Sequence, residues 1–180
     1  MSQALAAGTD VALASLGARA FEIPLDAPES DGTAEWDSTV MVVVEAHAGG
    51  ETGLGYTYGS RACRVLVDEL LAPAVVERDA FAVSAAWDAM VAACRNAGAV
   101  GAASMAIAAV DLALWDRAGR RTGRPVAHLL AAGAATSVPV NATIGAEDRS
   151  GAASAASAAA RDGFRCVKVK VGIEIGRAHV

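Results

Sequence analysis

The stretch FRCVKVKVG, residues 164–172, is the segment around which the rest of this chain is organised. Side chains alternate between the two faces of a β-strand, so Cys166, Lys168 and Lys170 share one face while three valines share the other. Two ammonium groups on one face repel each other, which favours the neutral amine in at least one of them and suits proton transfer. The alternative is an edge strand whose lysines face water, because edge strands often carry lysine. The rest of the chain decides between these interpretations.

The composition limits the class of protein. The chain has 180 residues, enough for one sizeable core or two small ones. Its formal net charge of -5, from 15 basic and 20 acidic residues, argues against nucleic acid or an anionic membrane surface as the main partner. Apolar residues make up 54%, but many are alanine and no apolar run reaches the ~18 residues of a membrane span. We therefore expect neither a nucleic-acid partner nor a membrane segment.

The N-terminus and the cysteines indicate the cellular compartment. Residues 1–15 are expected to be poorly ordered, and they lack the basic start of a secretory signal. Three cysteines, Cys63, Cys94 and Cys166, are odd in number and have no metal-ligand spacing. This pattern is typical of reduced packing residues, so we expect a cytoplasmic protein.

The first part of the chain predicts a small sheet. Alternating residues predict three strands, the last two joined as a hairpin by Gly49 and Gly50, over residues 16–25, 38–48 and 51–59. The segment DAPESDGTAEWD, residues 26–37, is polar and irregular. It predicts a loop of about a dozen residues, a length that is common in lids and binding loops.

Helices are expected after this sheet. Apolar residues at helical spacing predict helices over residues 61–76, 79–97, 102–121 and 126–130. The third is apolar nearly all round, so we expect it to be buried and to end at Gly123. Asp116 and Arg120 form a stabilising i,i+4 pair, and Asp111 needs a tertiary partner if it is buried. We interpret both aspartates as structural.

The pattern of predicted secondary structure changes after a small-residue linker at residues 131–136. A strand at 137–145, a helix at 147–162 and the lysine strand form a βαβ unit, which requires a parallel sheet. We therefore expect two domains, at residues 16–132 and 133–173. The last residues, EIGRAHV at 174–180, do not continue the pattern and match the translation of a common sequencing adapter. We expect this tail to be non-native.

Four segments together resemble the enolase superfamily, in particular its mandelate racemase and muconate lactonizing enzyme branch. They are STVMVVVEAHAGGETGLGYTYG (38–59), AIAAVDLALWDRAGRRTGRPVAHLL (106–130), SVPVNATIG (137–145) and CVKVKVG (166–172). The resemblance implies an α+β capping domain followed by the first β/α units of a modified TIM (β/α) barrel, which is incomplete here. A complete barrel of this kind needs about 250 residues.

The resemblance also assigns roles to the lysine pair. Lys170 holds the position of a general base that takes a proton α to a carboxylate. Lys168 is then the charged neighbour that favours the neutral amine and holds the substrate carboxylate. Barrel chemistry lies at the C-terminal ends of strands, so Asn141 and Thr143 are expected either to contact substrate or to be polar residues that end a strand.

Two lids over the site are implied as well. One is the loop at residues 26–37, which carries Trp36. The other is the turn region at residues 55–60, which carries Tyr56 and Tyr58. Each of these aromatic residues has an alternative role in packing, as a loop anchor for Trp36 and within the hairpin for the tyrosines.

The predicted function is therefore that of the N-terminal part of a Mg²⁺-dependent isomerase or lyase. A small carboxylate would be its substrate, and racemases, cycloisomerases and acid-sugar dehydratases are the reaction types implied. The metal would stabilise an enediolate in the full-length parent, and its acidic ligands are expected in later barrel strands that this chain lacks. The alternative is a catalytically inactive capping-domain fragment with only packing capacity. Homo-oligomerisation, the substrate and the reaction type stay open.

Overall fold

The computed structural model describes residues 11–30, 34–98, 100–145 and 148–170. The chain divides into two compact units. The first unit consists of Met1–Ile23 and Val40–Ala134, and the second of Pro24–Thr39 and Ala135–Val180. The second unit therefore combines residues 24–39 with the C-terminal segment. The predicted tail at residues 174–180 lies outside the described residues.

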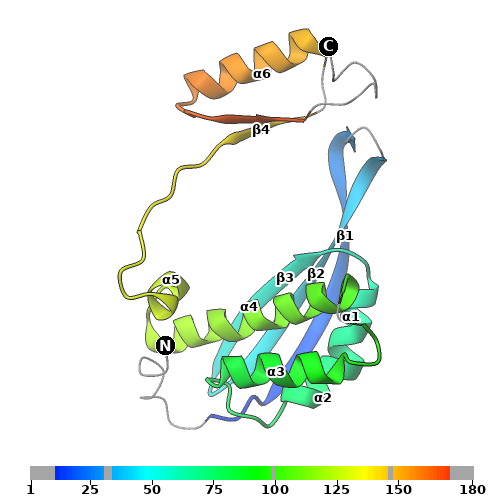
Figure 1. The fold of residues 1–180 in the computed structure, drawn as a ribbon, viewed down its shortest axis with the longest axis vertical. Coiled ribbons are helices and arrows are strands. Elements are labelled where there is room, and N and C mark those ends of the chain that lie inside the picture. The colour runs from blue at the N-terminus through cyan, green and yellow to red at the C-terminus, as the bar shows by residue number, and fades with distance from the viewer. Residues whose placement is uncertain (1–10, 31–33, 99, 146–147, 171–180) are drawn as a thin grey trace. The chain divides into compact units, whose positions relative to one another are not determined.

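A three-stranded sheet forms one layer of the first unit (Figure 1). Its strands are β1 (Ser15–Ser30), β2 (Glu35–Ala48) and β3 (Glu51–Tyr58), in the order β1-β2-β3. β2 and β3 pair antiparallel, with Val44 opposite Gly55. Gly49 and Gly50 connect them with φ angles of 60° and 81°, the positive values that a tight hairpin turn requires. The predicted hairpin is confirmed.

The predicted loop at residues 26–37 is wrong. β1 continues to Ser30 and β2 already begins at Glu35, so both ends of this segment are strand. The predicted first strand, at residues 16–25, is therefore too short at its C-terminal end. β1 lies at the edge of the sheet, however, and an edge strand tolerates Pro24 and Pro28 because their missing N–H groups need not face a neighbour.

Helices pack on one face of this sheet (Figure 1). The predicted helix at 61–76 is one continuous helical segment made of α1 (Ala62–Leu66), the π-helical turn η1 (Val67–Leu71) and α2 (Ala72–Val75). The wide π turn ends at Leu71, just before Pro73, whose nitrogen carries no N–H and cannot donate a regular i→i−4 hydrogen bond. The remaining helices are α3 (Val83–Ala93), α4 (Ala102–Thr122) and α5 (Val126–Leu130). α3 is shorter at both ends than the prediction of 79–97.

α4 is the helix on which the core of the first unit is built. Its residues Val110 and Leu114 are buried together with Val42, Val44 and Met90. The helix approaches β3 so closely that glycine is required there, because a Cβ atom on Gly55 would lie 1.9 Å from the backbone oxygen of Ala109. Gly123, at φ 64°, ends α4 as predicted. The helix was predicted to be buried nearly all round, but only the face with Val110 and Leu114 is buried.

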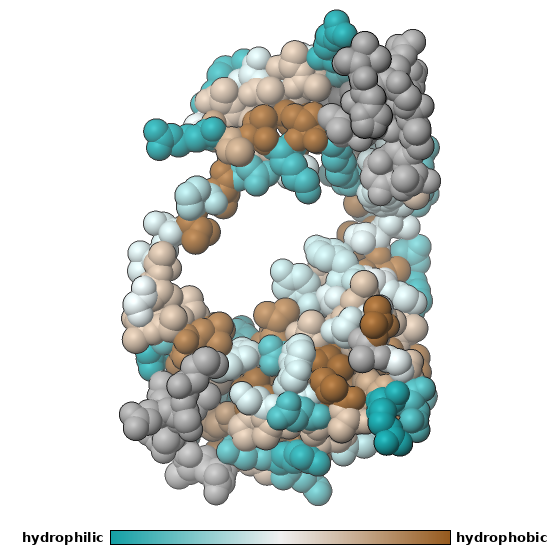
Figure 2. Space-filling view, in the orientation of Figure 1, coloured by the Kyte–Doolittle hydropathy of each residue, from teal (hydrophilic) through white to brown (hydrophobic). Residues whose placement is uncertain are grey.

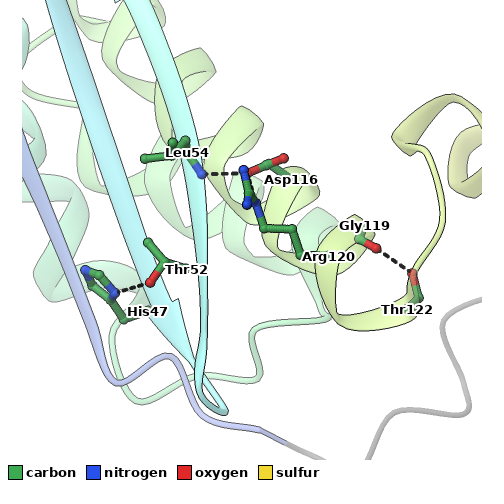
Figure 3. Close-up of polar contacts among 7 residues, drawn as sticks. All are labelled: His47, Thr52, Leu54, Asp116, Gly119, Arg120 and Thr122. Carbon is green, nitrogen blue, oxygen red and sulfur yellow. Dashed lines mark hydrogen bonds and ion pairs between the residues drawn. The ribbon is translucent and has the colours of Figure 1, made fainter.

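Polar contacts fix α4 to the edge of the sheet (Figure 3). The Leu54 amide donates to an Asp116 carboxylate oxygen at 2.8 Å, and Arg120 Nε donates to the same oxygen at 2.7 Å. Burial alone raises the pKa of Asp116, but the Leu54 and Arg120 contacts together outweigh it and lower the pKa below its usual value. The predicted Asp116–Arg120 pair is confirmed.

Arg117 is fully buried on the same helix. Its Nε and Nη2 atoms both donate to the Ala48 carbonyl at 3.3 Å, and its guanidinium carbon lies 4.4 Å from the centre of the Phe81 ring. These contacts hold the end of β2 against α4. A planar guanidinium suits this place because it donates two bonds and stacks on an aromatic face at once.

The second unit contains a parallel βαβ arrangement, which confirms that prediction. β4 (Ala142–Ile144) and β5 (Val167–Val169) pair in parallel, and α6 (Arg149–Arg161) connects them. Asp148 caps α6 by accepting a 2.7 Å hydrogen bond from the Gly151 amide. Both strands are much shorter than the predicted 137–145 and 164–172. Among the described residues each strand has only the other as a neighbour, and the Pro139 nitrogen cannot donate to a ladder.

The apolar face of β5 is largely uncovered in the part of the chain that the structure describes. Val167 and Val169 are 38% and 43% exposed. Figure 2 shows the corresponding apolar surface along β4 and β5, beside the alanine-rich helix α6. Within the described ranges, no helix is both long and apolar enough to cross a lipid bilayer.

Candidate active site

Lys170 is the centre of the candidate site. It follows β5 directly, and its backbone N–H donates to the Ile144 carbonyl at 3.1 Å, which fixes it at the C-terminal end of the strand pair. Its Nζ atom lies 2.8 Å from a Glu29 carboxylate oxygen and 5.3 Å from the centre of the Trp36 ring. The structure thus brings together two predicted residues, Lys170 and Trp36, and adds Glu29, which the sequence analysis did not single out.

Glu29 and Trp36 come from the segment that was expected to be a lid. Glu29 lies near the end of β1 and Trp36 near the start of β2. A cavity of about 380 Å³ opens beside Trp36 and is lined by Pro28, Glu35, Trp36 and Asp37. A carboxylate and an indole face both attract cations, so these side chains form an environment suited to the Lys170 ammonium.

Lys168 and Thr143 lie opposite each other in the β4–β5 ladder. Lys168 is exposed, in contrast to the partly buried Lys170. Asn141 precedes β4 instead of ending it, and its Nδ2 atom donates to the neighbouring Ala142 carbonyl at 3.3 Å. Asn141 therefore lies at the N-terminal end of β4, because the strand begins later than the sequence suggested. Thr143 is in the middle of the strand, and only Lys170 lies at a C-terminal strand end.

Tyr56 and Tyr58 lie in the first unit. Both belong to β3 rather than to a turn, and they are 53% and 55% exposed. Their ring centres are 6.1 Å apart with planes at 82°, an edge-to-face pair. They share a face of the sheet with Val43 and Met41, their partners on β2. This arrangement is the hairpin packing that was weighed as the alternative to a lid, and a substrate role for either tyrosine stays a prediction.

The Mg²⁺ ion that the resemblance implies would need several oxygen ligands. Within the described ranges, no group of three or more histidine, cysteine, aspartate or glutamate side chains converges as metal ligands would. Mg²⁺ needs near-octahedral oxygen coordination. The described residues of this chain therefore do not fit a magnesium ion on their own.

One signal in the sequence could have marked the site more sharply. Of the 15 basic residues, only Lys168 and Lys170 are lysines, and all the others are arginines. Lysine can give up its proton in a protein, whereas arginine does not. Because every other basic side chain is an arginine, the two lysines of this motif differ chemically from the other basic residues of the chain.

Comparisons with known proteins identify the family. Residues 29–131 match the profile described as "Mandelate racemase / muconate lactonizing enzyme, N-terminal domain". This range includes all of β2 and β3 and helices α1 to α5. The chain belongs to the mandelate racemase / muconate lactonizing enzyme family of the enolase superfamily, and the first unit is built on its capping domain.

Individual relatives support the family assignment. The chain is 36% identical over 161 residues to the 3,6-anhydro-alpha-L-galactonate cycloisomerase of Streptomyces coelicolor, covering 84% of this chain and 44% of that enzyme. The crystal structure of a mandelate racemase/muconate lactonizing enzyme-like protein from Rubrobacter xylanophilus is similar with a TM-score of 0.85 and 40% identity, over 93% of this chain and 47% of that one.

A third relative was crystallised with ligands. It is an enolase from Bradyrhizobium complexed with magnesium and mandelic acid, with a TM-score of 0.77 and 27% identity, over 89% of this chain and 46% of that one. The chain thus spans about half the length of the relatives it matches.

Proposed function

We propose that this chain is the N-terminal part of an enzyme that removes a proton α to the carboxylate of a small organic acid, with Lys170 as the general base. The position of Lys170 at the C-terminal end of β5, in a chain of this family, carries the proposal. The cycloisomerase relative acts on an anhydro sugar acid, which favours a sugar acid as substrate and an isomerase or lyase as the class of enzyme.

The chemistry follows from the two amines. The neutral Nζ of Lys170 accepts the proton from the carbon next to the carboxylate, and the electron pair of the broken C–H bond moves into the carboxylate as an enediolate. Lys168, two residues earlier and exposed, supplies positive charge toward the substrate carboxylate. Return of a proton gives racemisation, whereas loss of a β-substituent gives elimination. Asn141, Thr143, Trp36, Tyr56 and Tyr58 are proposed to contact the substrate.

A divalent ion would belong to the complete enzyme. When bound, Mg²⁺ supplies electrostatic stabilisation of charge on the substrate carboxylate. The described residues do not provide its ligands, so we place these in later strands that would follow β5. The three cysteines are free, which fits a reducing compartment such as the cytoplasm.

The alternative function is a capping-domain fragment that is inactive by itself. The exposed valines of β5 favour this for the 180 residues alone, because a two-stranded pair with one helix does not complete a barrel. Titration calorimetry with MgCl₂ tests whether the metal ligands lie outside this chain, as both functions require. We expect the 180-residue chain to release no binding heat, and saturable Mg²⁺ binding by this chain would contradict the placement of the ligands in later strands.

The decisive experiment starts from the gene. Resequencing the locus should reveal an in-frame continuation in place of residues 174–180, and a native stop after Val180 would overturn the proposal. The extended protein should exchange the α-proton of a sugar acid with deuterium from the solvent. Lys170→Arg should lower that exchange by roughly 10²–10⁴-fold, while Arg165→Lys on the same segment should leave it unchanged. Equal exchange in both variants would exclude Lys170 as the base.

A further inference from the structure

The Glu29–Lys170 ion pair joins residues that are 141 positions apart in the sequence. It leaves the Lys170 side chain only 23% exposed, while that of Glu29 stays 50% exposed. Trp36 lies against the same ammonium, at 5.3 Å from its ring centre. Lys168, in contrast, is exposed. The two lysines of the motif are therefore held differently before any ligand binds.

The contact conflicts with the role proposed for Lys170. A general base must present its amine to the substrate carbon, and the Glu29 carboxylate lies 2.8 Å from that same Nζ atom. Glu29 must therefore leave Nζ before Lys170 can act as a base. The geometry permits this, because Glu29 is half exposed and ion pairs at such sites are weak.

The carboxylate group of Glu29 indicates which kind of ligand could displace Glu29 from Lys170. A substrate of the proposed class carries a carboxylate, the same group that Glu29 presents to Nζ at 2.8 Å. The neighbouring acids Glu35 and Asp37 line the cavity, and no bond from either to Lys170 is recorded among the described residues. Among the described acids of this segment, Glu29 is thus the one placed to occupy the position of a ligand carboxylate.

We propose that Glu29 is a positioning residue that stands in for the ligand carboxylate at Lys170 and is displaced when an anionic sugar acid binds. This inference rests on the proposed function, since the sugar acid is the substrate class proposed above. Glu29 keeps the amine in place beneath Trp36 while the site is empty, and its release couples ligand binding to the freeing of Lys170.

The composition of the chain makes a direct test possible. With Lys168 and Lys170 as the only lysines, a protein labelled with ¹³C-lysine gives separate ε-methylene NMR signals for these two residues, assigned by Lys168→Arg. Glu29→Gln should shift the Lys170 signal and leave that of Lys168 in place. The matched control Glu35→Gln, which changes an acid of the same hairpin segment, should shift neither signal. A Lys170 signal that is insensitive to Glu29→Gln would overturn the proposal.

Titration with galactonate then tests displacement. The acid should shift the Lys170 signal with saturation, and the neutral polyol galactitol should not. Because Glu29 competes with the ligand, Glu29→Gln should bind galactonate more tightly, by about tenfold if Glu29 occupies Lys170 nine-tenths of the time. Weaker or unchanged binding in Glu29→Gln would overturn the proposal, and so would the absence of any galactonate effect on the wild-type signal.

Different measurements test the general-base role of Lys170 and the positioning role of Glu29. The NMR readout of the Glu29 contact involves no turnover, so it stands even if an extended protein with Lys170→Arg keeps its full proton exchange. Conversely, Lys170→Arg could abolish exchange while Glu29→Gln leaves the Lys170 signal unchanged. That result would support Lys170 as the general base and exclude only the role of Glu29. Circular dichroism spectra that are unchanged between the variants ensure that the fold is preserved.

Discussion

Two pairs of strands in this chain have the same alternating sequence pattern and opposite surroundings. Val44 on β2 is fully buried, because α4 covers its face of the sheet. Val169 on β5 is 43% exposed, because within the described residues α6 and β4 leave that side chain partly open. Alternation fixes which side chains share a face, but only a covering layer turns that face into a core. Stability should therefore depend far more on the first pair.

The largest loss of stability should come from a substitution where β3 and α4 approach each other most closely. Gly55→Ala would place a Cβ atom 1.9 Å from the Ala109 oxygen, so β3 and α4 must separate. We expect a loss of about 3 kcal/mol or more in the free energy of unfolding, measured by urea denaturation. Gly17→Ala on β1 is the control, since nothing lies within 4 Å of its added atom. Equal stability of the two variants would refute the close packing.

The comparison between the valines can be measured directly. Val44→Ala removes buried methyl groups and should cost about 2 kcal/mol of unfolding free energy. Val169→Ala removes the same atoms from a partly exposed position and should change it by less than about 0.5 kcal/mol. Similar losses in both variants, by thermal or chemical denaturation, would mean that something covers β5 in solution.

A smaller effect is expected where α4 meets the edge of the sheet. The pKa of Asp116 is lowered, so the charged carboxylate stabilises the fold above its usual value of 3.8, and this stabilisation is lost as the pH falls through the lower folded value. Asp116→Asn should cost about 1 kcal/mol at pH 7 and less at pH 3, measured by denaturation at both pH values. A cost that is independent of pH would show that the charge of Asp116 plays no part.

The smallest effect has the opposite sign and lies on the same helix. Burial raises the pKa of Asp111, so its neutral form stabilises the fold below pH 3.8 and this advantage is lost as the pH rises through the higher folded value. Asp111→Asn should therefore stabilise the protein by about 0.5 kcal/mol at pH 7 and by nothing near pH 3. Destabilisation at pH 7 would indicate a binding partner for the carboxylate, which lines a cavity of about 230 Å³ with Trp87 and Trp115.

The local parts of the fold could be predicted from the sequence. The Gly49–Gly50 hairpin, the end of α4 at Gly123 and the βαβ unit all depend on residues close together in the chain. The length of β1 could not be predicted, because its edge position, which makes Pro24 and Pro28 acceptable, is a property of the whole sheet.

The polar contacts that matter most lie beyond any local pattern. Arg117 reaches the Ala48 carbonyl across 69 residues, and on the sequence alone it is one arginine of a polar helix end. In the site, the motif itself located Lys170, whereas its partner Glu29 is 141 residues away in a segment that was interpreted as an irregular loop. A long-range ion pair needs the fold before it can be recognised.

The hydrogen bond from Leu54 to Asp116 also bears on how this protein avoids aggregation. β3 ends the strand order of its sheet, so its outer backbone groups are a template for an incoming strand of another molecule. The Leu54 amide is already occupied by the Asp116 side chain, at 2.8 Å. Asp116, on the helix that covers the sheet, thus blocks part of that template. We expect its loss to increase aggregation of the protein as well as to lower its stability.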